Sequence, residues 1–206
     1  MEPFQVHRGV AAPLLRNNID TDAIIPSREM KRVSKQGLGE GLFAAWRYTL
    51  PGGREPNPDF VLNHADYAGT SILLGGLNFG CGSSREHAVW ALKEFGIRAV
   101  IAPSFGSIFY SNCIRNGILP VVLEETKLSE LAAAVEAEPQ SAQIEIDLPK
   151  QEVLSPDGIR YGFELDSGHK RMLLEGLDGI ALTLQHAADI DAFESEDRAA
   201  RPWIYG

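Results

Sequence analysis

Residues 71–102 read SILLGGLNFGCGSSREHAVWALKEFGIRAVIA and contain a strand, a turn, a helix and a second strand in sequence. The run 71–77 is apolar and glycine-bounded, which is typical of a buried strand. A glycine-rich turn follows at residues 78–87, and the next residues place apolar side chains on one helical face: Ala88, Val89, Leu92 and Phe95. Gly96 is the expected helix end, and residues 99–102 are a second apolar strand.

The segment that follows repeats this pattern. Ser104 is expected to begin a second helix, and Asn116-Gly117 to end it. One face of that helix is apolar, through Phe105, Ile108, Phe109 and Cys113. Residues 118–123 form a third apolar strand. Strands that alternate with helices are typical of a parallel sheet with right-handed crossovers, so the sequence predicts an α/β fold with a parallel β-α-β-α-β core.

Further elements are predicted on both sides of this core. We expect strands at residues 4–7, 144–148 and 160–165, and helices at residues 128–138, 167–175 and 188–196. Residues 28–58 are rich in glycine and proline and carry aromatic side chains, which is more typical of a functional loop than of a linker. No repeat or break in composition is visible, so we expect one domain spanning residues 1–206.

The composition argues against several classes of protein. The chain has 206 residues, 44% of them hydrophobic, and a formal net charge of −9. This negative charge argues against nucleic acid and anionic membrane surfaces as partners. No apolar run approaches the roughly 20 residues of a membrane span. The N-terminal residues lack the pattern of a signal peptide, so we expect a cytoplasmic protein.

The turn at residues 80–86, GCGSSRE, is the strongest candidate for a functional site. Ser83 and Glu86 have the spacing of a capping box, so Ser83 can simply be the N-cap of the following helix. Alternatively, the free N–H groups and positive dipole end of a helix start favour an anion, either a substrate carboxylate or an alkoxide on Ser83. Arg85 adds a guanidinium that can bind a carboxylate with two hydrogen bonds. Both interpretations stay open at this point.

Metal ligands are scarce in the sequence. The two cysteines, Cys81 and Cys113, cannot complete a four-thiolate zinc or iron–sulfur site. Asp20 and Asp22 are more typical of turn or cap residues than of a metal site. We expect His87 to be structural, and Cys81 to be a small packing residue rather than a nucleophile. The sequence therefore predicts no metal site in this chain.

Several motifs along the chain form a recognisable set. Residues 75–88 read GGLNFGCGSSREHA, residues 104–113 read SFGSIFYSNC, and residues 20–26 read DTDAIIP. They resemble the two signatures and the N-terminal motif of the swivelling domain of the aconitase superfamily. Residues 176–184 resemble the C-terminal part of one branch of that superfamily. The resemblance implies the swivelling β/β/α fold, with the parallel core described above at its centre.

The resemblance also implies a hydro-lyase reaction, in which a hydroxy-dicarboxylate is dehydrated and the alkene is rehydrated at the neighbouring carbon. The chain's size and motifs resemble the branch that converts 2-isopropylmalate to 3-isopropylmalate in leucine biosynthesis. In that branch a 4Fe–4S cluster acts as Lewis acid, and three cysteines of a separate large subunit hold it. The implied protein binds no cofactor itself, forms a hetero-oligomer with the large subunit and is active only in that complex.

Site residues are carried over from the family only where its motifs match. Ser83 aligns with the catalytic base, and Ser84 and Arg85 align with residues that bind substrate carboxylate. Asp22 aligns with an active-site aspartate, although a simple turn role remains open. A substrate-binding arginine is expected shortly after the Asp motif. We prefer Arg28, with Lys31 and Arg32 as alternatives.

Two other functions are compatible with the same fold. A related hydro-lyase would act on homoaconitate or a methyl-substituted malate, and side chains at residues 30–48 would decide between these substrates. A non-catalytic binding module is the second alternative. Loss of Ser83 or Arg85 would favour it, and both residues are present.

Overall fold

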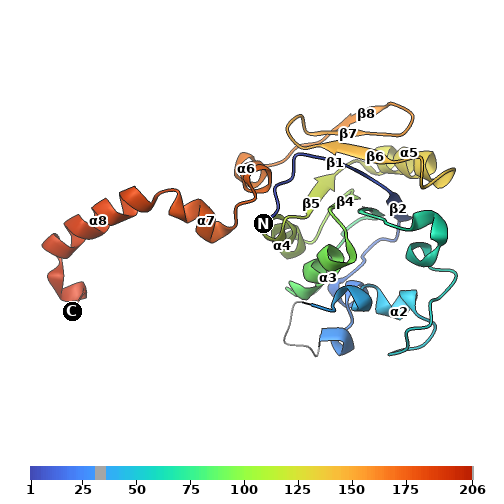
Figure 1. Cartoon of the computed structure of the whole chain (residues 1–206), viewed down its shortest axis with the longest axis horizontal. Helices are drawn as coiled ribbons and strands as arrows, with labels where there is room; N and C mark the ends of the chain where they lie inside the picture. The colour runs from blue at the N-terminus through green and yellow to red at the C-terminus, as the bar shows by residue number, and fades with distance from the viewer. Residues whose placement is uncertain (31–35, 206) are drawn as a thin grey trace.

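The computed structural model describes residues 1–30 and 36–205 and contains two four-stranded sheets with helices packed around them (Figure 1). The parallel sheet has the order β2-β3-β4-β5. Its strands are β2 (Ala11–Leu14), β3 (Ile72–Gly75), β4 (Ala99–Ala102) and β5 (Leu119–Val122). Helix α3 (His87–Phe95) connects β3 to β4, and α4 (Ser107–Asn116) connects β4 to β5. The predicted parallel β-α-β-α-β core is confirmed.

The second sheet is antiparallel and has the order β1-β6-β7-β8. It contains β1 (Val6–Gly9), β6 (Ile144–Asp147), β7 (Glu152–Leu154) and β8 (Arg160–Gly162). The predicted strands near residues 4–7, 144–148 and 160–165 are therefore present, with shifted ends. Helix α5 (Glu125–Glu136) leads from β5 into this sheet, and α6 (Ser167–Glu175) follows it. Both helices confirm the sequence prediction.

The parallel strands are buried on both faces, which explains their continuous apolar runs. Successive residues point to opposite faces: Leu73 joins one hydrophobic cluster and Leu74 the other. The cluster of Leu73 also contains α3 side chains and aromatics of the long N-terminal segment. The cluster of Leu74 contains residues of α5 and of the antiparallel sheet, including Ile146. The parallel sheet is thus the middle layer of the molecule.

Both central helices begin later than the sequence predicts. α3 begins at His87 rather than near Ser83, and α4 begins at Ser107 rather than Ser104. The residues just before each helix are not helical, because Gly82 has a left-handed backbone (φ +92°) and Gly106 is extended (ψ 130°). The two turns also pair with each other, since Phe79 N–H donates to Ser104 O (3.0 Å) and Gly106 N–H donates to Phe79 O (2.9 Å). The predicted apolar face of α4 is also wrong at Ile108, which is exposed.

The described part of the segment 28–58 is more structured than its composition suggests. It contains the short helix α2 (Ala44–Arg47) and 3-10 turns at Ser27–Met30 and Gly39–Gly41. Phe43 is fully buried and stacks on Trp46 with ring centroids 5.7 Å apart. Further 3-10 turns at Val61–Asn63 and Ala65–Tyr67 lead into β3. The buried aromatics of this segment belong to the core of this chain.

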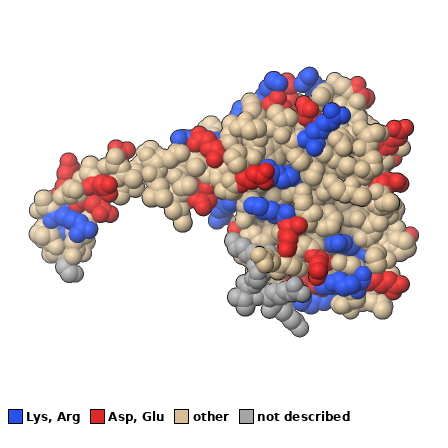
Figure 2. Space-filling model, in the orientation of Figure 1, with Lys and Arg blue, Asp and Glu red and all other residues tan. Residues whose placement is uncertain are grey.

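The C-terminal residues form an arm that projects from the globular part (Figure 1). The arm contains α7 (Gly179–Leu184), α8 (Ala187–Ala200) and a final turn (Pro202–Ile204), and neither helix has a buried residue. The predicted helix at 188–196 is confirmed and is longer than expected, whereas α7 is not apparent from the sequence. Figure 2 shows acidic side chains on the arm, and α8 carries Asp189, Asp191, Glu194, Glu196 and Asp197. Among the described residues, no helix has the length and apolar character needed to cross a membrane.

Candidate active site

The start of the glycine-rich turn runs beside a segment that is far away in the sequence, residues 18–21. Asn18 N–H donates to Leu77 O (2.8 Å), Gly80 N–H to Ile19 O (2.7 Å) and Thr21 N–H to Cys81 O (2.9 Å). These bonds attach the Asp motif of residues 20–26 to the Gly-Ser-Ser-Arg motif. Helix α1 (Thr21–Ile24) starts directly at the junction. The site therefore depends on tertiary pairing between the two motifs that the sequence singled out.

The turns before α3 and α4 cross at a very short distance, which requires glycine at both positions. Gly80 has a φ of +73°, and a Cβ there would lie 2.1 Å from the ring of Phe109. A Cβ on Gly106 would lie 2.6 Å from the carbonyl oxygen of Gly80. Side chains at either position would separate the turns. Glycine here thus brings the start of α4 against the turn that carries Ser83.

Ser83 is not a helix cap, which corrects the first interpretation of the sequence. The N-cap of α3 is Glu86, and it makes no side-chain capping bond. The physical reason is the irregular backbone before it, with left-handed Gly80 (+73°) and Gly82 (+92°). The Ser83 hydroxyl instead forms a hydrogen bond with the hydroxyl of Thr21, with 3.0 Å between the oxygens. Ser83 is solvent-exposed and therefore open to a ligand.

A small pocket of about 220 Å³ lies beside Ser83. The glycine-rich turn forms one wall, and Gly106 with the first turn of α4 forms the other. The first N–H groups of a helix have no partner within the helix, and the dipole places partial positive charge there. The helix that presents its positive end to the Ser83 pocket is therefore α4, whereas the sequence predicts α3 in this role. This electrostatic environment favours negative charge on a ligand or on the Ser83 oxygen.

Arg85 lies just before α3 and forms an ion pair with Asp22 through Nη1 and Oδ1. The Arg85 side chain is 27% exposed and that of Asp22 is 57% exposed, so the pair is at the surface of the site. Asp20 has a different role, because its Oδ1 accepts a hydrogen bond from Ala23 N–H (2.7 Å) and caps α1. The two aspartates of the motif therefore have different roles: Asp20 caps α1, and Asp22 is the partner of Arg85.

The remaining predicted residues are Ser84 and Arg28, and neither is among the residues that line the Ser83 pocket. Ser84 is exposed and adjacent to Ser83 in the turn. Arg28 lies in the 3-10 turn Ser27–Met30, and its Nε is 3.4 Å from Glu29 Oε1. Arg28 does not line the Ser83 pocket, so its contact with substrate remains a prediction. The alternatives Lys31 and Arg32 lie outside the described residues.

The thiols and the nearby histidine have no catalytic arrangement. Cys113 is fully buried in α4, and burial raises the pKa of its thiol well above the ordinary value. Cys81 is partly exposed and lines the Ser83 pocket. His87 packs against Trp90 with ring centroids 4.7 Å apart, in agreement with a structural role. Within residues 1–30 and 36–205, no three His, Cys, Asp or Glu side chains are grouped to bind a metal ion.

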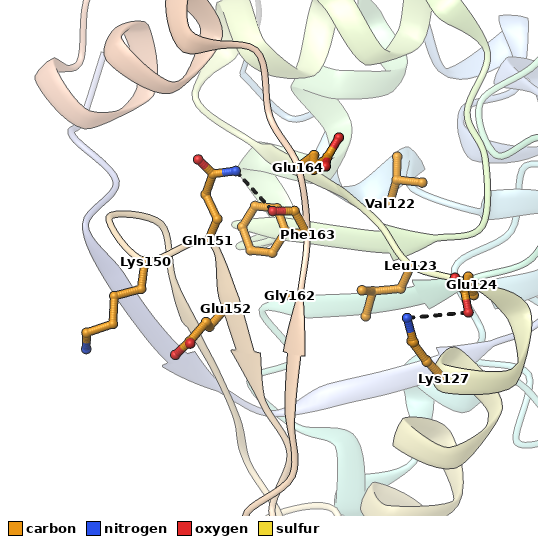
Figure 3. A pocket seen from close by; sticks show the side chains of 10 residues that line it. All are labelled: Val122, Leu123, Glu124, Lys127, Lys150, Gln151, Glu152, Gly162, Phe163 and Glu164. Carbon is orange, nitrogen blue, oxygen red and sulfur yellow. Dashed lines mark hydrogen bonds and ion pairs between the residues drawn. The ribbon is translucent and has the colours of Figure 1, made fainter.

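A larger hollow lies elsewhere, between α5 and the β7–β8 hairpin (Figure 3). Its volume is about 740 Å³. Most of the charged side chains at its wall are paired with neighbours: Lys127 with Glu124, Lys150 with Asp147, and Glu152 with Arg160. Paired surface charges do not indicate a ligand, and the hollow is remote in sequence from the motifs. The smaller pocket at Ser83 is the better candidate site.

The fold and this site define a class, the swivelling domain of the aconitase superfamily. The family model described as aconitase C-terminal domain matches residues 1–126. A model described as LeuD_N matches residues 129–167, and the model for the C-terminal domain of the 3-isopropylmalate dehydratase small subunit matches residues 180–206. The last match falls on the segment that forms the projecting arm, so the sequence of this segment resembles that of the family.

Relatives and a solved structure identify the particular family. The 3-isopropylmalate dehydratase small subunit of Cupriavidus necator is 65% identical over 205 residues, which cover 100% of this chain and 99% of the relative. The same subunit of Magnetococcus marinus is 50% identical over 100% of this chain and 99% of the relative. A crystal structure of 3-isopropylmalate dehydratase from Methanocaldococcus jannaschii is similar with a TM-score of 0.65 and 28% identity, covering 92% of this chain and 99% of the other. The chain belongs to the family of 3-isopropylmalate dehydratase small subunits.

The family defines the reaction. The activity is that of a hydro-lyase in leucine biosynthesis, and a small subunit works together with a large subunit. The sequence predictions of superfamily, fold, reaction and branch are thereby confirmed. The alternatives of a related substrate or a non-catalytic module receive no support from these relatives.

Proposed function

We propose that Ser83 is the base that removes the proton next to a substrate carboxylate, and that Ser84 and Arg85 bind that carboxylate. The observation that supports this most directly is the position of Ser83 in a pocket formed by the positive end of α4. A serine hydroxyl is a weak base until its alkoxide is stabilised. N–H groups and a helix dipole directed at the oxygen provide such stabilisation without reorganisation.

Arg85 has the chemistry for carboxylate recognition. Its guanidinium presents several N–H donors in a planar fork, and Asp22 engages Nη1. The donors that face away from Asp22 can bind a substrate carboxylate with two parallel hydrogen bonds. Ser84, exposed beside Ser83, adds a hydroxyl donor to the same group. In this arrangement Asp22 acts as a positioning residue for Arg85.

The partner completes the site. Two cysteines, one of them fully buried, are too few for an iron–sulfur cluster with three thiolate ligands, so the proposal assigns the 4Fe–4S cluster to the large subunit. That cluster would supply a Lewis acid for the leaving hydroxyl. Because Ser83 and Ser84 are exposed here, the large subunit would also exclude water from the pocket. The substrate is a dicarboxylate, for which we propose Arg28 as a further ligand.

We also propose that the chain works in the cytoplasm. Cys81 and Cys113 are both free thiols, which is compatible with a reducing compartment. A fractionation experiment with an antibody against the chain would test this proposal. Recovery in an extracytoplasmic fraction would contradict it.

The test of the proposed base is Ser83→Ala in the complex with the large subunit. We expect turnover to fall at least about 100-fold, the lower range for one general base. Exchange of the substrate proton with solvent deuterium should also be lost, because this exchange reports the proton-transfer step itself. Ser84→Ala is the matched control, and it should change KM more than kcat. A Ser83→Ala complex that assembles and turns over at the parent rate would require another base.

A further inference from the structure

We propose that Thr21 is a positioning residue that holds the Ser83 hydroxyl in its reactive orientation and donates a hydrogen bond to its deprotonated oxygen. This inference rests on the proposed role of Ser83 as base. It gives a function to the central residue of the Asp-Thr-Asp motif, for which the sequence alone predicts none. The direct observation is the 3.0 Å contact between Thr21 Oγ1 and Ser83 Oγ, which joins positions 62 residues apart.

The Thr21 hydroxyl is fixed more firmly than that of Ser83. Thr21 is 1% exposed, whereas Ser83 is open to solvent. Both backbone groups of Thr21 are hydrogen-bonded, because the Thr21 N–H donates to Cys81 O (2.9 Å) and the Thr21 carbonyl accepts from Ile25 N–H (3.0 Å). A β-branched side chain also has few χ1 states. Thr21 is therefore a rigid point to which the more exposed Ser83 side chain is attached.

The chemistry of the bond suits a base that changes its protonation state. Each hydroxyl can donate or accept, so neutral Ser83 can donate to Thr21 or accept from it. Once Ser83 has lost its proton, Thr21 must be the donor. Hydrogen bonds to a charged oxygen are stronger than those to a neutral one, so the contact strengthens as the alkoxide forms. Burial of Thr21 keeps water from competing for its hydroxyl.

The three residues of the motif thus have three separate contacts. Asp20 caps α1 through Ala23 N–H. Thr21 holds Ser83, and Asp22 pairs with Arg85. The backbone bond from Thr21 N–H to Cys81 O sets the register, so that the side chains of Thr21 and Asp22 each meet their own partner in the glycine-rich turn.

The experiment compares Thr21→Val with Thr21→Ser in the complex with the large subunit. Valine keeps the shape and removes the hydroxyl, whereas serine keeps the hydroxyl and removes the methyl group. We expect Thr21→Val to lower kcat at least about tenfold with KM within about threefold, the scale of one hydrogen bond to a charged group. Solvent deuterium exchange should fall in parallel. Thr21→Ser should retain a kcat within about threefold of the parent value.

The matched control is Thr70→Val. Thr70 is also buried, at 3% exposure, and its hydroxyl donates to Tyr67 O (2.6 Å) away from the glycine-rich turn. This variant should keep the parent kcat. If Thr21→Val does not fold, Thr21→Ala takes its place, since a smaller side chain avoids crowding. Parent-like kcat in the hydroxyl-deficient variant, or an equal loss in Thr21→Ser, would overturn the inference.

A double variant separates this inference from the proposed function. If Thr21 acts through Ser83, Thr21→Val should cost no further activity when Ser83 is already alanine. If Ser83→Ala itself is harmless, the proposed base is wrong. If Ser83→Ala inactivates the complex and Thr21→Val does not, the base stands and the role of Thr21 is wrong.

Discussion

Arg85 and Asp22 form an ion pair that joins the end of the glycine-rich turn to a position 63 residues earlier in the chain. Both side chains are partly exposed, and ion pairs of this kind contribute about 0–1 kcal/mol to stability. The pair is therefore a weak contributor to folding. Its more important effect is geometric, because it fixes one edge of the guanidinium and leaves the other donors for a ligand.

Arg85→Lys should weaken the enzyme although the positive charge is retained. An ammonium cannot form two parallel hydrogen bonds to a carboxylate, so we expect a loss of about 1–3 kcal/mol in kcat/KM, which is about 5-fold to 150-fold. The measurement is steady-state kinetics of the assembled enzyme with 2-isopropylmalate. The control is Arg160→Lys, at the surface ion pair with Glu152, and it should leave kcat/KM unchanged. Equal kinetics for both variants would remove Arg85 from the carboxylate site.

Asp22→Asn tests the orienting role of the carboxylate. Asparagine preserves the shape and removes the charge, so Arg85 loses its ionic partner and samples more orientations. We expect a higher KM, by about threefold to thirtyfold, with a smaller change in kcat. Thermal stability should change little because the Asp22 side chain is 57% exposed. A large loss of kcat at unchanged KM would instead indicate that Asp22 takes part in proton transfer.

The elements that were predictable from sequence are those set by local patterns. β3 and β4 are apolar runs between glycines, and Gly96 and Gly117 end their helices in the left-handed conformation. β2 is not apparent because its sequence, Ala-Ala-Pro-Leu, lacks the β-branched and aromatic residues that are enriched in strands. The amphipathic pattern of α5 likewise identifies it before any contact is known.

The site was predictable as a set of residues but not as an arrangement. Ser83 and Glu86 have a capping-box spacing, yet the backbone bonds from Gly80 and Thr21 to the opposite segment prevail over that local preference. The contact between Thr21 and Ser83 depends on this long-range pairing, which single-sequence patterns do not contain. The position of Arg28 depends on a loop, and loops are the parts of a fold that local periodicity describes least.

The antiparallel sheet contains a histidine that should make stability depend on pH. Burial, followed by the nearby charge of Arg98, lowers the pKa of His7 below 6.5. Because the unfolded chain then binds a proton more readily than the folded one, stability should fall as the pH drops from about 6.5 through the folded pKa. We expect the urea midpoint of the parent to decrease over this window and that of His7→Gln to decrease less. Parallel curves for the two proteins would contradict this assignment.

The projecting arm should be dispensable for the stability of the globular part. α7 and α8 have no buried residue, so a chain ending after Leu177 loses no core contact from these helices. We expect its thermal midpoint to remain within about 2 °C of the parent, since shifts of several degrees require about 1 kcal/mol. Leu173→Ala, at a fully buried position in α6, is the contrasting variant and should cost about 2–5 kcal/mol. A strong destabilisation on truncation would support the predicted single domain of residues 1–206, with the arm as an integral part.

Gly80→Ala should be far more damaging than an alanine at a glycine of the same backbone conformation. Gly80 (φ +73°) and Gly69 (φ +75°) both lie in the left-handed region, where an L-residue costs about 1–2 kcal/mol. They differ in surroundings, because a Cβ on Gly69 meets no atom within 4 Å, whereas one on Gly80 would lie 2.1 Å from the Phe109 ring. Phe109 is 2% exposed and cannot move into solvent without opening the core. We therefore expect Gly69→Ala to lower the free energy of unfolding only by the cost of its left-handed backbone. Gly80→Ala should lower it by about 1–3 kcal/mol more because of overpacking, and urea unfolding of both variants measures the difference. Because the same movement would separate α4 from Ser83, turnover of the assembled Gly80→Ala enzyme should also fall. Equal unfolding midpoints for the two variants would show that the turns can move apart without a loss of stability, and that their close crossing does not hold the site together.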